Sequence, residues 1–274
     1  MKLLIAVDME GITGVCNWDH VDPSKVDYQR YRRLMTADVN AAIAGAGAAG
    51  VSEIVVSDGH AFGQNILLEE LDPRARLNAG NHAPFAMVQG ADGQINAAFM
   101  VGYHARMGSL HAVLDHTWSS ERISDVWLNG QPVGELGLNS AALGAFGVPV
   151  LMVSGDQTLG AEAREWIPGV ETAVVKQATS RYSAECLPPA VSQPLIREAA
   201  ERAVKRFKAG EGPAPVKVSE PVVVTVAFQN TAQADGAQLT PGAVRLDGRR
   251  VEIRTGTMLD AYFAFRTLSG MSNR

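Results

Sequence analysis

Three short apolar segments of the sequence each end at side chains that can bind a metal ion. These are Asp8 and Glu10 after LLIAV, Asp58 and His60 after EIVVS, and His104 after AAFMVGY. Uninterrupted apolar segments of this length are typical of parallel strands that are buried on both faces. In an open α/β sheet the carboxyl ends of the strands meet at one edge, where ligands bind. Carboxylates and imidazoles gathered there predict a site for a divalent metal ion.

The carboxylates among these side chains can be interpreted in more than one way. Asp8 and Glu10 are two positions apart, so their side chains lie on the same side of an extended chain and can share a metal site. Asp8 could instead cap a following helix. Asp58 could bind the metal itself, or it could accept a hydrogen bond from the imidazole of a ligand.

Two further side chains are candidates for the same site. Glu135 lies in the first turn of a predicted helix, where the helix dipole alone would favour a carboxylate. His116, which follows Asp115, could be a nitrogen ligand, a general acid or base, or an ordinary loop histidine. The other histidines have no supporting context, and we expect them at the surface: His20, His82 and His111.

The segments that must position these side chains alternate between strand and helix patterns. Further strands are predicted at residues 76–80, 148–156 and 172–177. Helices are predicted at residues 28–49, 134–146, 157–166 and 192–208. In residues 124–133, the pair Asn129-Gly130 predicts a hairpin turn. The alternation predicts an α/β fold with a mainly parallel sheet flanked by helices.

The pattern changes beyond residue 190, where the predicted helix at residues 192–208 is charged and amphipathic. The segment AGEGPAPVKVSEP is typical of a linker or a long turn. It precedes a predicted strand, an extended segment and a final helix, at residues 222–228, 243–254 and from 257 onward. We therefore expect an α/β metal-binding catalytic domain at residues 1–208 and a smaller C-terminal α+β portion at residues 209–274, although the two could form one domain.

The composition excludes several classes of protein. The 274 residues are 46% hydrophobic and 19% charged, as expected for a globular protein. A net charge of −5 without a basic stripe argues against nucleic acid as a partner. No apolar run approaches the roughly 20 residues of a membrane helix, and the N-terminus lacks a signal peptide, so we expect a cytoplasmic protein. Cys16 and Cys186 are expected to be free thiols.

Several familiar catalytic motifs are absent from the sequence. It contains no G-x-S-x-G nucleophile elbow, no G-x-x-x-x-G-K-[ST] phosphate loop and no H-E-x-x-H helix. Gly45, Gly47 and Gly50 match G-x-G-x-x-G, but they follow a predicted helix and precede a strand. The dinucleotide-binding motif requires the reverse order, so a Rossmann cofactor is disfavoured.

The segments VDMEGITG, SDGH, VGYHAR and PVGELGLNSAALGAFGVPVLMVSGD resemble the DppA-type zinc D-aminopeptidases, a bacterial family associated with dipeptide transport. The resemblance continues through KQATSR and QNTAQAD and covers most of the chain. It implies a catalytic role for His116 and a ring-stacked homo-decamer that encloses its active sites. It also implies two zinc ions per chain, held by Asp8, Glu10, His60, His104 and Glu135.

We therefore expect a binuclear zinc aminopeptidase that releases the N-terminal residue, a D-amino acid, from short peptides by attack of a metal-activated water. In this hypothesis Glu10 bridges the metals, with Asp8 as the alternative. His116 donates a proton to the leaving amine or stabilises the oxyanion. A related metal-dependent amidohydrolase or an L-specific peptidase would use the same ligands. A binding module with a structural metal is disfavoured, because structural zinc sites are usually rich in cysteine.

Overall fold

A seven-stranded sheet forms the centre of the computed structural model, which describes residues 1–80 and 84–272. The expectation for His82 lies outside these residues. The strands of this sheet, in spatial order, are β3 (Ala75–Asn78), β2 (Glu53–Asp58), β1 (Lys2–Val7), β4 (Ala97–Val101), β7 (Val150–Asp156), β8 (Glu171–Ser180) and β9 (Ser183–Cys186). All neighbouring pairs are parallel except β8 and β9. The predicted mainly parallel sheet is confirmed.

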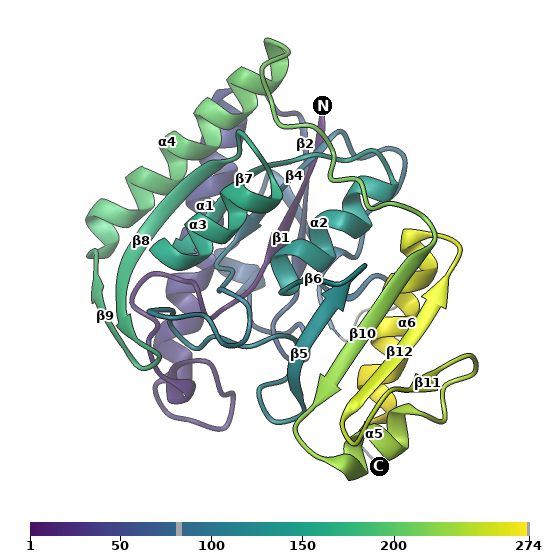
Figure 1. Cartoon of the computed structure of the whole chain (residues 1–274). Helices are drawn as coiled ribbons and strands as arrows, with labels where there is room; N and C mark the ends of the chain where they lie inside the picture. The colour runs from purple at the N-terminus through teal and green to yellow at the C-terminus, as the bar shows by residue number, and fades with distance from the viewer. Residues whose placement is uncertain (81–83, 273–274) are drawn as a thin grey trace.

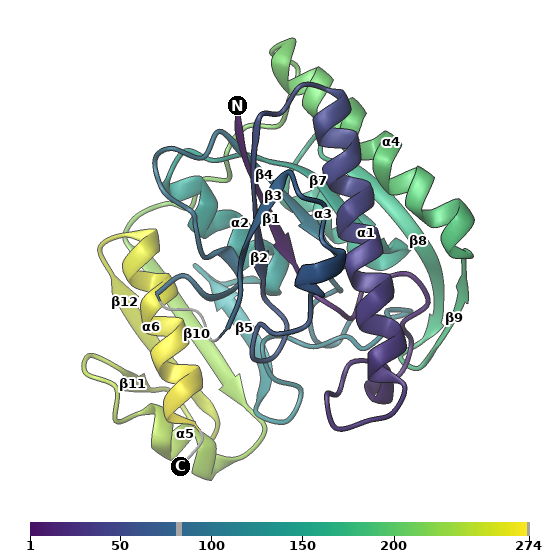
Figure 2. The same ribbon diagram turned by 180° about the vertical axis from the view of Figure 1, so that it is seen from behind.

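Helices cover both faces of this sheet (Figures 1 and 2). They are α1 (Tyr28–Ala48), α2 (Glu135–Ala145), α3 (Gln157–Trp166) and α4 (Pro189–Lys208). Two further helices, α5 (Thr231–Ala237) and α6 (Met258–Met271), pack against the strands β10 (Val222–Phe228) and β12 (Arg250–Thr255) of a second sheet. The helices α1 and α4 lie side by side on one face, as Figure 2 shows, whereas α2 and α3 lie on the other. Among the described residues, no helix is long and apolar enough to cross a membrane.

The position of β1 inside the sheet, between β2 and β4, explains why its sequence is apolar without interruption. Leu3, Ile5 and Val7 belong to the hydrophobic cluster under α1 and α4, whereas Leu4 and Ala6 belong to the cluster on the opposite face. Alternate side chains of a strand point to opposite faces, so a strand between two helical layers must be apolar at every position. The run ends at Val7, and the polar residues follow where the strand leaves the sheet.

A second, antiparallel sheet of five strands packs beside the first (Figure 1). Its strands, in spatial order, are β11 (Val244–Arg245), β12 (Arg250–Thr255), β10 (Val222–Phe228), β5 (Ile123–Leu128) and β6 (Gln131–Pro132). The turn between β5 and β6 is Asn129-Gly130, with φ of 49° and 80°, as the predicted hairpin requires. This sheet contains strands from both sides of residue 208. The domain boundary between residues 208 and 209 stays a prediction.

Among the described strands and α-helices, β9 and α5 were not predicted from the sequence. The edge strand β9 is a four-residue hairpin partner of β8, too short for a clear alternation of polar and apolar residues. The helix α5 has only seven residues, although Asn230 and Gln233 form a capping box at its start. Short elements such as these depend more on their tertiary contacts than on local sequence pattern.

Candidate functional site

The predicted site residues come together at the carboxyl ends of three adjacent strands. Asp8 follows β1, His60 follows β2, and His104 follows β4. Because β1 lies between β2 and β4, the three strand ends are neighbours. Glu135 is the first residue of α2. Glu10 lies in the turn after β1, rather than in the strand itself, and still faces the same histidine as Asp8.

Each of the imidazoles of His60 and His104 has a ring nitrogen close to the oxygens of two carboxylates. His60 Nδ1 lies 3.4 Å from Asp8 Oδ1 and 3.1 Å from Glu10 Oε2. His104 Nε2 lies 3.3 Å from both Asp8 Oδ2 and Glu135 Oε1. Asp8 therefore directs one oxygen toward each of the two imidazoles, and it does not cap a helix.

These side chains are almost completely removed from solvent. Asp8, Glu10, His104 and Glu135 are all less than 5% exposed. Despite the short distances, Asp8 Oδ2, Glu10 Oε2 and His104 Nε2 make no hydrogen bond to any described residue. Buried polar atoms without partners are destabilising, and close carboxylates repel one another. A cation bound among these atoms would relieve both effects.

The backbone fixes the orientation of all three imidazoles. Val21 O lies 2.9 Å from His60 Nε2, Ala105 O lies 3.0 Å from His104 Nδ1, and Leu114 O lies 2.8 Å from His116 Nδ1. A carbonyl oxygen only accepts hydrogen bonds, so the nitrogen that faces it must carry a proton and donate. The other nitrogen of each ring, which faces the carboxylates, is then the one available to bind a metal.

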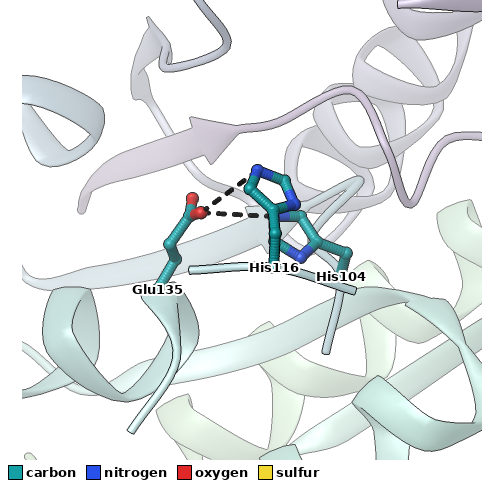
Figure 3. A group of neighbouring side chains, drawn as sticks. All are labelled: His104, His116 and Glu135. Atoms are coloured by element: carbon teal, nitrogen blue, oxygen red, sulfur yellow. Dashed lines mark ion pairs between the residues drawn. The ribbon is translucent and has the colours of Figure 1, made fainter. Parts of the chain in front are cut away.

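His116 lies against His104 and Glu135, as Figure 3 shows. Its Nε2 is 3.7 Å from Glu135 Oε1, and its ring is stacked on that of His104 with 4.0 Å between the centroids. Trp118, two residues later, donates its backbone N–H to Glu135 Oε1 at 2.7 Å. Leu114 and Trp118 have positive φ angles of 49° and 66°, and such strain in non-glycine residues is often found at functional sites.

Two sets of ligand atoms within 4.8 Å of one another could each hold a metal ion. One set comprises Asp8, Glu10 and His104, and the other comprises His104, His116 and Glu135. All five side chains are buried. His60, which contacts two of these carboxylates, completes the cluster. Carboxylate oxygens and imidazole nitrogens are donors that zinc accepts.

The cluster perturbs the pKa values of its members. Burial would raise the pKa of Asp8, but contacts with His104 and His60 outweigh burial and hold this pKa below its usual value. Burial and Asp8 raise the pKa of Glu10, whereas His60 lowers it, and the net shift is downward. Burial would lower the pKa values of His60 and His104, but the carboxylates raise them well above the usual value. The cluster therefore favours positive charge between its carboxylates.

His116 differs from the other two imidazoles. Its burial and the neighbouring charge of His104 lower its pKa. The ring is therefore neutral at pH 7, with Nδ1 protonated toward Leu114 O and Nε2 unprotonated toward the site. A neutral imidazole in this tautomer can accept a proton at Nε2.

Asp58 takes neither of the roles considered for it. Its oxygens accept hydrogen bonds from Asn65 N at 2.6 Å, Asn65 Nδ2 at 2.7 Å and Ile66 N at 2.8 Å. The acceptor for the His60 imidazole is instead the carbonyl of Val21. Asp58 thus fixes the loop that carries His60, because unpaired N–H groups of that loop need a buried acceptor.

The remaining described histidines lie outside the cluster. His20 is partly buried and stacks on Tyr31 at 3.8 Å between centroids, so it is not a plain surface residue. His111 is exposed, as expected, and its Nδ1 faces Thr179 O. Cys16 and Cys186 are free, as predicted.

A cavity of about 440 Å³ opens over the cluster. Asp8, Glu10, His60, His116 and Glu135 form its acidic and imidazole end. Its other walls combine small residues with aromatic and basic side chains, which are Trp18, Phe62, Trp118, Arg122 and Arg266. The volume lies in the range of small-ligand sites.

Buried polar groups beneath the site were not identified from the sequence. Lys176 donates to the carbonyl of Glu10, and Asn139 donates to Tyr103 Oη and accepts from Tyr262 Oη. A lysine within the apolar strand sequence AVVKQA was the available signal for the first of these. The tyrosines gave no such signal, because their partners are distant in sequence.

Comparisons with known proteins agree along the whole chain. Residues 1–267 match the model of peptidase family M55, described as D-aminopeptidase. The D-aminopeptidase of Bacillus subtilis (strain 168) is 38% identical over 275 residues, which cover 100% of this chain and 98% of that protein. The solved structure of the Zn-dependent D-aminopeptidase DppA from Bacillus subtilis, described as a self-compartmentalizing protease, superposes with a TM-score of 0.95 at 38% identity. The superposition covers 100% of this chain and 98% of that one.

Proposed function

The chain belongs to the D-aminopeptidase family M55 and is a peptide-bond hydrolase, and we propose that it is a zinc-dependent enzyme that removes an N-terminal D-amino acid from short peptides. The observation that carries this proposal is the buried cluster at the carboxyl ends of β1, β2 and β4. Its carboxylates and imidazoles face one another with unpaired ligand atoms. The relatives described as D-aminopeptidases support the substrate class.

We assign two zinc ions per chain to this cluster. The ligands in this assignment are Asp8, Glu10, His60, His104 and Glu135. The unpaired atoms Asp8 Oδ2, Glu10 Oε2 and His104 Nε2 support it, because they are donors that suit zinc and lack any described hydrogen-bond partner. Asp8 directs its two oxygens to His60 and His104 at 3.4 and 3.3 Å. Asp8 would therefore offer one oxygen on the side of each of these imidazoles.

Zinc bound here would supply the Lewis acid that polarises the peptide carbonyl and lowers the pKa of water. The chain itself supplies the proton transfer. His116 Nε2 faces Glu10 Oε1 and Glu135 Oε1 at 4.0 and 3.7 Å, and its lowered pKa leaves it unprotonated at pH 7. In our proposal His116 accepts the proton that the attacking water releases and passes it to the leaving amine.

The cavity supports a short substrate. A volume of about 440 Å³ suits a peptide of a few residues rather than a folded chain. The aromatic side chains Trp18, Phe62 and Trp118 offer apolar surface for the side chains of such a peptide.

The assembly and location belong to the same proposal. We infer that the chain forms a homo-oligomer, a decamer, and the support is the description of the DppA structure as a self-compartmentalizing protease. We also infer a cytoplasmic protein, and its two unbridged cysteines support a reducing compartment.

Zinc content and hydrolysis of stereoisomeric dipeptides test this function. We expect about two zinc ions per chain and faster hydrolysis of D-Ala-D-Ala than of L-Ala-L-Ala. His111→Ala, which removes an exposed imidazole outside the cluster, is a matched control that should keep both properties. Fully zinc-loaded protein that cleaves neither dipeptide would refute the proposal. Preference for L-Ala-L-Ala would indicate an L-specific peptidase, and ammonia release from D-Ala amide without dipeptide cleavage would indicate an amidohydrolase.

A further inference from the structure

Two cationic side chains, one in β8 and one directly after it, hold loops of the site from outside the cavity. Lys176 lies within the strand, and Arg181 follows its last residue, Ser180. Neither side chain lines the cavity. Each nevertheless makes contacts with a loop that carries one of the proposed functional residues, at a separation of more than 60 residues in sequence.

Lys176 holds the loop that contains Glu10. Its ammonium donates to Glu10 O at 2.6 Å, Ile12 O at 3.0 Å and Val15 O at 2.6 Å. A lysine ammonium has three N–H donors, so all of them are used. The side chain is 1% exposed, and a buried charge is tolerated only when polar groups replace the lost water. The lysine and the three carbonyls therefore depend on one another.

The opposite side of the same loop is also fixed. Gly11 N donates to Gly102 O at 2.8 Å, two residues before His104. The loop between Asp8 and Val15 is thus held between the end of β4 and Lys176. Because Glu10 O is one of the acceptors of Lys176, the lysine fixes the backbone from which the Glu10 carboxylate projects toward His60.

Arg181 holds the loop that contains His116. Its Nη2 donates to Asp115 O at 3.0 Å, and its Nε lies 3.3 Å from Asp115 Oδ1. Its own carbonyl accepts from Leu114 N at 2.9 Å. Arg181 therefore contacts the two residues before His116, and the carbonyl of one of them, Leu114, orients the His116 ring. The other oxygen of Asp115 accepts from Gly108 N at 2.7 Å, which closes the loop on itself.

We propose that Lys176 and Arg181 are positioning residues with separate tasks, an inference that rests on the proposed zinc peptidase function. Lys176 keeps the Glu10 loop in the conformation that binds zinc. Arg181 keeps the His116 loop in the conformation that transfers a proton. The two residues act through the loops, and neither touches the substrate.

Lys176→Met tests the first task, because it keeps the length and apolar stem of the side chain and removes the three N–H donors. Lys208→Met is the matched control, since the Lys208 ammonium also donates to two backbone carbonyls, Ala49 O and Gly50 O, at the end of α1. Zinc affinity is measured by competition with a chelator, and the melting temperature is recorded without metal. Loss of groups that support metal ligands typically weakens metal binding by about 10–100-fold. We expect a loss in that range for Lys176→Met and none for Lys208→Met.

Zinc affinity within about threefold of wild type in folded Lys176→Met would overturn this task. If that variant does not fold, Lys176→Gln is measured in the same way. The Gln amide retains two N–H donors and should weaken zinc binding by a smaller factor. Wild-type affinity in folded Lys176→Gln would then overturn it.

Arg181→Met tests the second task, with Arg206→Met as its control. Arg206 also pairs with a carboxylate and a backbone carbonyl, Glu171 Oε1 and Gly169 O, at the opposite end of β8. We expect Arg181→Met to lower kcat by about 10–100-fold, with zinc affinity and KM close to wild type. Arg181→Lys, which keeps the charge, should restore part of kcat. Unchanged kcat, or an equal loss in Arg206→Met, would overturn this task.

The same measurements separate this inference from the proposed function. Wild-type protein that binds no zinc or cleaves no D-peptide would refute the proposed function. The inference alone would be refuted by a different result. In that case wild-type protein binds zinc and cleaves D-peptides, the Lys176 variant has unchanged zinc affinity, and the Arg181 variant has unchanged kcat.

Discussion

Replacing Asp38 by Asn should stabilise the folded protein near neutral pH but not in acid. Asp38 lies on α1 and is 1% exposed. Its carboxylate accepts hydrogen bonds from Thr13 N at 2.9 Å and from Thr13 Oγ1 at 3.0 Å. An Asn amide can replace both bonds. Its oxygen would accept from Thr13 N, and its NH₂ would donate to Thr13 Oγ1, whose own proton can turn to Ser192 Oγ at 2.8 Å.

The size of the effect follows from the pKa of Asp38. Burial raises this pKa from 3.8 to about 6, against the hydrogen bonds from Thr13 and the charge of Lys176, which lower it. Each pKa unit corresponds to about 1.4 kcal/mol, so the shift is worth roughly 3 kcal/mol. Because the folded-state pKa is raised, protonated Asp38 favours the folded state. Its contribution is fully present below pH 3.8 and is lost as the pH rises through about 6.

Asn does not titrate, so the stability gain of the variant should depend on pH. The free energy of unfolding of Asp38→Asn minus that of wild type should rise by roughly 2 kcal/mol between pH 4 and pH 6.5 and level off above pH 7. Urea unfolding of both proteins at several pH values, with zinc chelated, measures this difference. Asp27→Asn is a control, because exposed Asp27 at the start of α1 makes no capping hydrogen bond. A pH-independent difference for Asp38→Asn would show that the buried carboxylate ionises without penalty.

Three substitutions test the site more directly. His104→Ala should abolish turnover, because this strand-end ligand supports chemistry more than packing, and circular dichroism should show an intact fold. Wild-type turnover with full zinc content in this variant would contradict the assignment of His104 as a ligand. His116→Ala should lower kcat by about 10²–10⁴-fold with zinc content unchanged, whereas loss of one zinc ion per chain would identify His116 as a ligand. Gly11→Ala should reduce zinc content, because its new Cβ would overlap the carbonyl oxygen of Tyr103, and Gly256→Ala, with open space around it, should not.

The sequence predicts the strand ends well because their cause is local. A strand that is buried on both faces must be apolar throughout, and the first polar residues then mark where the backbone leaves the sheet. Asp8, His60 and His104 follow directly from that pattern. The position of His116 could not be derived in this way, because its loop has no periodic pattern. Contacts to Glu135 and to Arg181, distant in sequence, hold that loop in place.

Lys176 and Asp58 show a second limit of local reasoning. A lysine in an apolar strand predicts a buried charge, but its three acceptors lie more than 160 residues away. Asp58 stands beside His60 in sequence, yet its carboxylate turns to the loop at Asn65 and Ile66. In both residues the type of side chain shows that a partner is required, and only the fold determines which partner it is.

The order of the strands explains why the three predicted strand ends form one site. β1 lies between β2 and β4, and the chain leaves it toward α1 on one face of the sheet. After β4 the chain passes to the other face, where α2 packs. The connections therefore diverge next to β1, and in open α/β sheets such a point leaves a crevice at the carboxyl ends of the strands. Asp8 follows β1 and contacts a histidine from each neighbouring strand end, so the place of β1 between β2 and β4, rather than the local sequence, accounts for the position of Asp8 in the cluster.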